Sequence, residues 1–325
     1  MANDPFLDAT GAPRSSRFGG GGTIRTVKWV GGLVILALLL YYPVGMLIVH
    51  KIDDDPNFKA PAVPAGASQS VAITAALINR EVNQNRWVSN DPFFLPGAAL
   101  DNMPNFQQGI IQALSRYVLE LQDQIGRSRA SSSIDTDLQR ALGLLKYSPT
   151  VWLWDPSVSL APTASSETQY RAAMKALESY NDRLARGQAV FEPRADNLLV
   201  TLDGIGKDLG SATNDIDNQI DQNSGNWLDF TADDVFYRTK GLAYAYALVL
   251  RDLGTDYKQV IQEKGAANIW QRMVGSLMDA AALRPWIVVN GRPDAQLQPN
   301  HLAAIGFYLQ RARTQLYEMM DVLQK

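Results

Sequence analysis

The residues that could carry chemistry are few and widely spaced in this sequence. It contains no cysteine and two histidines, His50 and His301. A chain without cysteine has no disulfides, no thiolate nucleophile and no cysteine metal ligands. Neither histidine has a second histidine at the helical spacing of a zinc hydrolase, and no nucleophile elbow accompanies His301. We therefore predict no catalytic, metal-binding or cofactor-binding residues, and the sequence does not favour an enzyme.

Acidic residues occur in groups, but their spacing does not suit acid–base catalysis. Asp233 and Asp234 are neighbours, and Asp215 and Asp217 lie two residues apart. Such close neighbours on a helix point in different directions, and the first pair suits a helix N-terminus. The run Asp53–Asp55 lacks the spacing and glycine of a calcium loop, so we expect a solvated acidic turn.

One aromatic segment, Trp87–Phe106, interrupts the helical pattern and is rich in proline, asparagine and aspartate. Long connections of this kind are uncommon inside compact domains and are often functional. Two interpretations stay open: the aromatic residues cap the end of a bundle, or they form a rigid surface for a partner or a membrane leaflet. A second aromatic loop, Tyr147–Trp154, could adjoin the first. The candidate interaction residues are Trp87, Asn90, Asp91, Pro92, Phe93, Phe94, Asp101, Asn102, Trp152 and Trp154.

The uncharged run Trp29–Val49 predicts a transmembrane helix, because it is long enough to cross a hydrocarbon core of about 30 Å once. It is longer than the apolar region of a cleaved signal peptide, which favours an uncleaved signal anchor. Basic residues are more numerous on the N-terminal side of the run, which favours a cytoplasmic N-terminus. The flanking basic residues are Arg14, Arg17, Arg25 and Lys28 before the run and Lys51 and Lys59 after it.

These features predict four consecutive parts of the chain. Residues 1–28 form a flexible cytoplasmic arm and residues 29–49 the transmembrane helix. Residues 50–67, rich in proline and alanine, form a semi-extended stalk, and residues 68–325 form a helical periplasmic domain. The net charge is −3, and the basic residues do not form a cluster along the sequence. Both observations argue against nucleic acid as a partner.

Apolar residues spaced three and four apart predict a mainly α-helical fold, in which the transmembrane helix is followed by a multi-helix bundle with long helical hairpins and one aromatic loop. These stripes are expected to bury inside the bundle, although a partner chain could also cover them. Thr231 and Asp234 resemble a capping box, and Trp286–Val289 resembles a short strand before a turn. The predicted helices are 69–83, 105–125, 135–145, 167–186, the segment after Pro193 through Ile216, 231–250, 266–283 and 302–323.

Several motifs resemble an uncharacterised domain-of-unknown-function family of proteobacterial single-span inner-membrane proteins. They are Trp87 with Asn90-Asp91-Pro92, the run Leu100–Gln107 with Gly109, Arg127–Leu138, and Arg194–Leu198. The resemblance implies a Gram-negative inner-membrane location and brings no known activity.

The sequence thus favours a membrane-anchored periplasmic interaction or scaffold protein of the cell envelope. Its expected partners are the lipid bilayer, through Trp29–Val49, and an envelope protein or a second copy of the chain. The alternative is an envelope hydrolase acting on peptidoglycan or lipid, with a site near residues 87–106.

Overall fold

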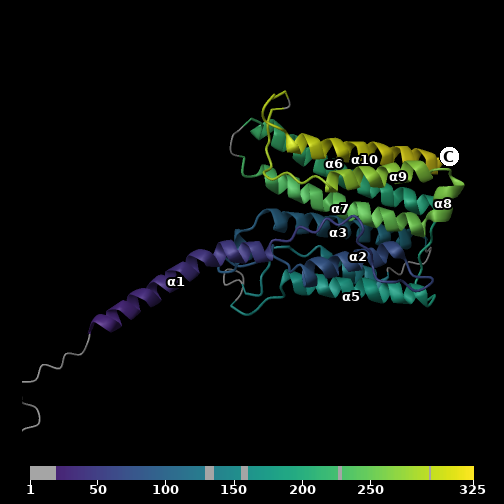
Figure 1. Ribbon diagram of the computed structural model, residues 1–325. Helices are drawn as coiled ribbons and strands as arrows, with labels where there is room; N and C mark the ends of the chain where they lie inside the picture. Colours follow the sequence, from purple (N-terminus) through teal and green to yellow (C-terminus); the bar gives the residue numbers. More distant parts are fainter. Residues whose placement is uncertain (1–19, 129–134, 155–159, 226–228, 293) are drawn as a thin grey trace, which may run out of the picture. The chain divides into compact units, whose positions relative to one another are not determined.

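The computed structural model describes residues 20–128, 135–154, 160–225, 229–292 and 294–325. Within these ranges the chain is predominantly helical, and its residues form no β-strand (Figure 1). The mainly α-helical prediction is therefore confirmed. The α-helices are α1 (Gly20–Val49), α2 (Gln69–Asn79), α3 (Asn102–Ser128), α4 (Thr136–Leu145), α5 (Ser166–Ala185), α6 (Ala195–Asn223), α7 (Ala232–Asp256), α8 (Lys258–Glu263), α9 (Ala267–Ala281) and α10 (His301–Gln324).

The chain divides into two compact units, residues 1–48 and residues 49–325. The first contains α1, whose segment Thr26–Val49 is the one described helix that is long and apolar enough to cross a membrane. Its apolar side chains are exposed, as expected for a helix compatible with a single-pass anchor. The helix begins at Gly20, within the expected arm, while residues 1–19 of that arm lie outside the described residues.

The second unit is a layered helical domain built around α7. In Figure 1, α7 and α3 lie between α6, α9 and α10 on one side and α2 and α5 on the other. The residues Gly241–Leu250 of α7 are all buried, because this stretch is apolar around its whole circumference. The stripes of the long helices α6 and α10 are also buried inside this unit, so the expected self-burial is confirmed.

Helices α3 and α7 run side by side in the same direction. Gly109 of α3 faces the backbone carbonyl of Arg238, and Gly241 of α7 faces the backbone carbonyl of Phe106. A Cβ atom at either glycine would overlap the facing carbonyl oxygen. The two glycines therefore allow the two backbones to approach closely, as small residues do at tightly packed helix interfaces.

Local contacts define the end of α5 and the start of α7. Gly187 follows α5 with φ +68°, and the N–H of Gln188 donates to the carbonyl of Arg183, which completes a Schellman motif. Helix α7 begins after Thr231 as predicted, but the capping box is wrong: the Thr231 hydroxyl donates to Asp229 instead of capping the helix.

The predicted strand at Trp286–Val289 is also wrong. This segment is irregular, and the nearest pairing is a single bridge between Asn290 and Asn300. A strand needs a neighbour to satisfy its backbone groups, and the surrounding helices provide none along this segment.

The segment expected to be a stalk belongs to the second compact unit. Ile52 and Phe58 pack against its hydrophobic core, and Gly66 lies against the end of α5 at Ala185. At the far end of the segment, Ser68 caps α2 and hydrogen-bonds Asp256 of α7 at 2.7 Å. Residues 50–67 thus run along the domain, because they find both apolar and polar partners there.

Candidate functional site

A buried charged network holds the start of the second unit. Asp54 accepts hydrogen bonds from Lys240 of α7, at 2.7 Å between Oδ2 and Nζ, and from Arg284 after α9. The side chain of Lys240 is 1% exposed and that of Asp54 is 6% exposed. Lys240 also donates to the backbone carbonyl of Leu283 at 2.7 Å. The prediction of a solvated acidic turn is therefore wrong at Asp54.

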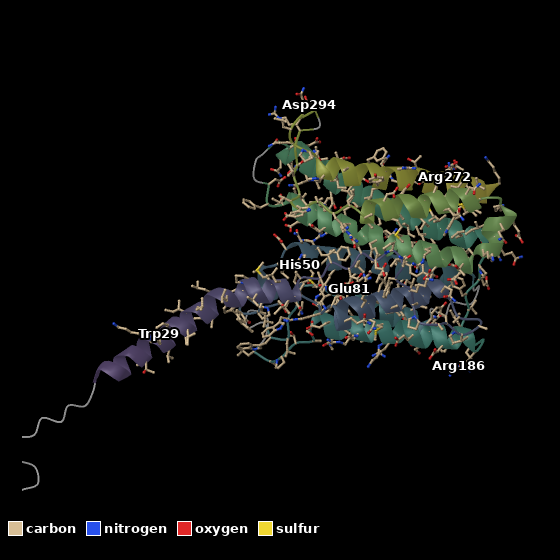
Figure 2. All side chains as sticks on the ribbon, viewed as in Figure 1. Trp29, His50, Glu81, Arg186, Arg272 and Asp294 are labelled. Carbon is tan, nitrogen blue, oxygen red and sulfur yellow. The ribbon has the colours of Figure 1, made fainter. Side chains whose placement is uncertain are left out.

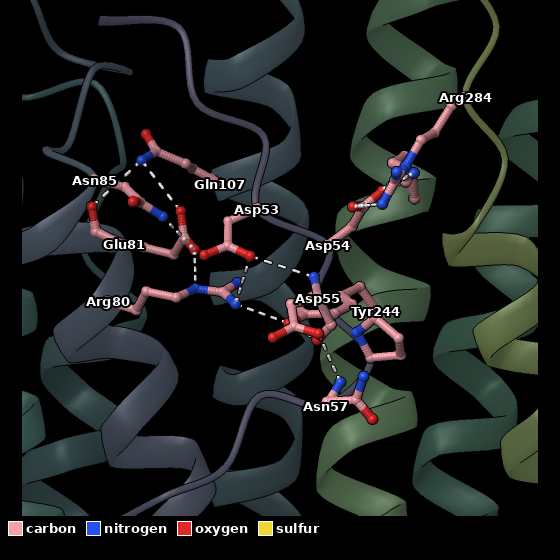
Figure 3. A network of polar contacts seen from close by, with 12 residues as sticks. Asp53, Asp54, Asp55, Asn57, Arg80, Glu81, Asn85, Gln107, Tyr244 and Arg284 are labelled. Carbon is pink, nitrogen blue, oxygen red and sulfur yellow. Dashed lines mark hydrogen bonds and ion pairs between the residues drawn. The ribbon is translucent and has the colours of Figure 1, made fainter.

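The network continues at a π-helical turn, Arg80–Gln84, which follows α2 and turns consecutive side chains inward (Figure 3). The Nε of Arg80 donates to Glu81 at 2.8 Å, and its Nη1 donates to the hydroxyl of Tyr244 at 2.7 Å. Nη1 also lies 3.5 Å from a carboxylate oxygen of Asp53. π-Helical turns are rare, and many of them occur at functional sites.

Aromatic and backbone groups complete the surroundings of Arg80. Its guanidinium carbon lies 4.6 Å from the centre of the Phe58 ring, a cation–π contact. The Tyr244 hydroxyl, which accepts from Arg80, donates in turn to the carbonyl of Asp55 at 2.7 Å. The residues that follow α1 are thus bound to the π-helical turn after α2, to α7 and to the segment after α9.

The pKa shifts of the two buried carboxyl groups in this network, Asp54 and Glu81, have opposite directions. Burial raises the pKa of Asp54, but hydrogen bonds from Arg284 and Lys240 outweigh burial and hold the pKa below its ordinary value. Burial raises the pKa of Glu81 above its ordinary value despite Arg80 and Gln107 beside it. Glu81 lies inside the domain (Figure 2). Asp54 is therefore held ionised, whereas burial in the core disfavours the charge of Glu81.

Several of the predicted interaction residues make internal contacts that hold the segment Trp87–Phe106 in place. Trp87 is 2% exposed, and its Nε1 donates to the carbonyl of Pro149 at 2.9 Å. Asn90 is buried and donates to the carbonyl of Val151 at 2.8 Å. Asp91 is fixed by Arg86, whose Nη2 lies 3.0 Å from both carboxylate oxygens. These contacts join the two aromatic loops, as the sequence suggested.

Other predicted residues reach the surface. Phe93 is 82% exposed, Phe94 and Trp154 are about half exposed, and Pro92 and Trp152 are partly buried. The Phe94 and Trp152 rings meet edge to face with centroids 5.5 Å apart, so the two loops share one aromatic surface. Whether this surface binds a partner stays a prediction.

Exposed apolar side chains collect at one end of the domain. The described loops at this end join α2 to α3, α4 to α5, α6 to α7 and α9 to α10. We call their large exposed apolar side chains the apolar end: Phe93, Phe94, Leu153, Trp154, Leu160, Phe230, Trp286, Ile287 and Leu297. Among the described residues of the second unit, the other large exposed apolar side chains are Phe307 and Tyr317 on α10.

Hydrogen bonds connect these loops to the point where the chain enters the domain. The N–H of Lys51 donates to Sδ of Met103 at 3.1 Å, and Ser89 donates to the carbonyl of Pro104 next to it, also at 3.1 Å. The N–H of Gly225 donates to the carbonyl of Asn290. The ion pair between Arg284 and Asp54 connects the α9–α10 loop, which carries Trp286, to the segment where the chain enters the domain.

An acidic cluster lies beside this end. The carboxylates of Asp101, Asp233 and Asp234 lie within 4.8 Å of one another, at the N-termini of α3 and α7. Burial and the charge of Asp101 raise the pKa of both Asp233 and Asp234. Helix N-termini favour acidic side chains, which accounts for this placement without a metal ion. Asn102, predicted beside Asp101, is the first residue of α3.

Sequence reasoning missed the charged network and most of the apolar end, of which it had named Phe93, Phe94 and Trp154. A signal existed for Lys240, a cation placed directly before the apolar stretch Gly241–Leu250. Trp286 and Ile287 were assigned to a strand because an apolar run does not show whether a neighbouring strand exists.

The geometry defines a class of protein: an apolar helix compatible with a membrane anchor, followed by a helical domain with exposed apolar loops at its chain-entry end. The chain belongs to the family described as an uncharacterized protein conserved in bacteria (DUF2333), which it matches over residues 51–228 and 221–325. The match begins just after α1 and covers the helical domain. No curated protein and no solved structure matches the chain.

Proposed function

We propose that the chain is a single-span protein of a bacterial inner membrane, with a cytoplasmic N-terminus and a periplasmic helical domain. The domain acts as an interaction or scaffold element of the cell envelope. The observation that carries this proposal is the gathering of exposed apolar side chains at the end where the chain enters the domain. Exposed apolar patches of this kind are typical of surfaces that contact a partner or a membrane.

The charged network supports the same role. It binds the residues directly after α1 to three parts of the domain, so the domain is attached to the span by a short connection. The excess of basic residues before the span supports the proposed orientation.

The location is tested with single cysteines, since the chain has none of its own. We expect Gln188→Cys, in an exposed loop of the domain, to react with a membrane-impermeant maleimide once the outer membrane is opened. Ser16→Cys, before the span, should react after the inner membrane is also opened. The reverse order of reactivity would refute the orientation, and recovery of the intact chain in the soluble fraction would refute the anchor.

The interaction is tested by purifying the intact protein in mild detergent, where we expect a stoichiometric partner or a second copy. The double variant Phe93→Ala/Phe94→Ala examines the aromatic loop, and Phe307→Ala, on the flank of α10, is its matched control. Loss of the partner in the double variant alone would assign the loop to a protein contact. Retention in both variants would place the protein contact on another face.

An envelope hydrolase is the second candidate, and one feature favours it. Asp234, whose pKa is raised by burial and by Asp101, lines a groove of about 430 Å³ together with Asn105 and Arg238. A carboxyl group with a raised pKa in a groove suits a general acid. Release of soluble fragments from peptidoglycan or of fatty acids from lipid, abolished by Asp234→Asn, would support this candidate.

A further inference from the structure

We infer that the apolar end docks on the lipid surface of the membrane that α1 spans, with its loop side chains inserted at the level of the headgroups. This inference rests on the proposed function, because it requires α1 to be a membrane span. It deepens that function by assigning one surface of the domain to lipid.

The first support is the place where the chain enters the domain. Contacts within the second unit alone fix this place: Lys51 is bound to Met103, and Asp53 and Asp54 are bound in the charged network. The four residue steps from Val49 to Asp53 cover at most about 14 Å when fully extended. The end that receives the chain therefore stays close to the membrane surface.

The second support is the contrast between the two ends of the domain. His50 and Asp294 lie toward the entry end and Arg186 lies at the other end (Figure 2). The described connections at the far end, residues 186–194 and residues 257–266 with the short helix α8, carry none of the large exposed apolar side chains. If the loop side chains were exposed for a reason unrelated to lipid, we would expect large exposed apolar side chains in the loops at both ends of the domain.

The third support is the chemistry of the side chains. Trp286 is fully exposed, Leu297 is 95% exposed and Ile287 is 75% exposed, so each costs free energy while it faces water. All three stand on the loop between α9 and α10, while Phe93 and Trp154 project from the α2–α3 and α4–α5 loops of the same end. Aromatic and aliphatic side chains of this kind are favoured at membrane interfaces.

Basic and acidic groups accompany the apolar side chains. Lys51 in the entry segment and Arg292 in the α9–α10 loop are exposed and could meet lipid phosphates, whereas Arg284 is paired with Asp54. Asp101 and Asp294 are exposed in the loops of the same end. Because both signs are present, we expect docking to depend mainly on apolar insertion and only weakly on salt.

The test uses the full chain in bilayers of phosphatidylethanolamine and phosphatidylglycerol. An environment-sensitive fluorophore is attached at Ile287→Cys, and matched controls carry it at Phe307→Cys, on the flank of α10, and at Gln188→Cys, at the far end. We expect phospholipids with a nitroxide near the headgroup to quench the Ile287→Cys label and not the controls. Aqueous iodide should quench the controls more than the Ile287→Cys label.

A second variant tests whether the loops insert together. With the fluorophore at Leu160→Cys, the additional change Trp286→Ser should reduce quenching by the nitroxide lipid. Trp286 is fully exposed, so this change leaves the core untouched.

Three results would overturn the inference: equal iodide quenching of the Ile287→Cys label and the controls, shielding of that label by a second copy with no lipid quenching, or unchanged quenching of the Leu160→Cys label in the Trp286→Ser variant. Failure of the proposed function is a separate outcome, because the chain would then not remain with the bilayer at all.

Discussion

Asp54 connects three segments that are far apart in the sequence. Its carboxylate lies between Lys240 of α7, which is buried, and Arg284 after α9, whose side chain is 70% exposed. Removing one partner of a buried ion pair is costly because the remaining charge stays buried without compensation. The reach of this single side chain explains how the residues after α1 are held against the domain.

We predict that Asp54→Asn destabilises the domain by about 3 kcal/mol, because Lys240 keeps its burial and loses its counter-charge. Urea unfolding followed by circular dichroism measures the change. The matched control is Asp203→Asn, which breaks the exposed pair between Asp203 and Lys207 and should leave the unfolding midpoint unchanged. Equal midpoints for Asp54→Asn and the wild type would contradict the importance of the buried pair.

The same residue predicts a pH dependence. The pKa of Asp54 is lower in the folded than in the unfolded chain, so the unfolded state takes up the proton first as the pH falls. The stabilisation from Asp54 is therefore fully present above the unfolded pKa of about 4 and is lost as the pH falls through the folded pKa. The stability gap between wild type and Asp54→Asn should stay constant near neutrality and narrow below about pH 4. A stability difference that widened below about pH 4 would contradict the lowered pKa of Asp54.

The pairing of α3 and α7 shows how two small residues set the distance between elements. Gly109 and Gly241 each face a backbone carbonyl of the other helix, so the contact is made by main chain and leaves no room for a side chain. The close approach allows Gln124, later in α3, to donate to the hydroxyl of Tyr257, just after α7, at 2.7 Å. The centre of the domain thus depends on the absence of two Cβ atoms.

We predict that Gly109→Ala lowers the free energy of unfolding by about 2–3 kcal/mol, since the new methyl group must push the two helices apart. Thermal unfolding by circular dichroism measures this loss. Gly143→Ala in α4 is the matched control, because a Cβ there meets nothing within 4 Å. Its higher helix propensity should stabilise the domain by up to about 1 kcal/mol. An equal loss in both variants would contradict the close approach of the two helices as the cause.

At the scale of the whole molecule, the helical domain contains its own core. Its buried apolar residues come from α2 to α10, and it forms a compact unit from Val49 onward. The charged network also lies entirely within this unit. The domain should therefore fold without the apolar helix.

We predict that a chain reduced to residues 49–325 keeps the helical circular dichroism and the unfolding midpoint of the domain in the full chain, both measured in the same mild detergent. The control is a chain that begins at residue 56, which lacks Asp53 and Asp54 and should unfold at a clearly lower temperature. Equal midpoints for the two shortened chains would contradict a stabilising role of the entry segment.

Part of this organisation is already determined by the sequence. The length and apolar composition of Trp29–Val49 and the three-to-four spacing of apolar residues in α3, α6 and α10 are local properties of the chain. They indicate an apolar helix and a helical domain whatever the later packing. The Trp87–Phe106 loop was recognised for the same reason, because proline and Asx residues interrupt a helical period locally.

The tertiary structure alone decided which residues meet. Asp54, Lys240 and Arg284 carry no mutual spacing signal, so no periodicity could place them in one buried network. The proximity of chain segments likewise turned an expected stalk into part of the domain. Whether Trp286 and Ile287 formed a strand or an exposed loop depended on the presence of a neighbouring strand. Local pattern fixes the conformation of a helix, but burial and charge pairing depend on contacts between distant segments, which only the folded chain establishes.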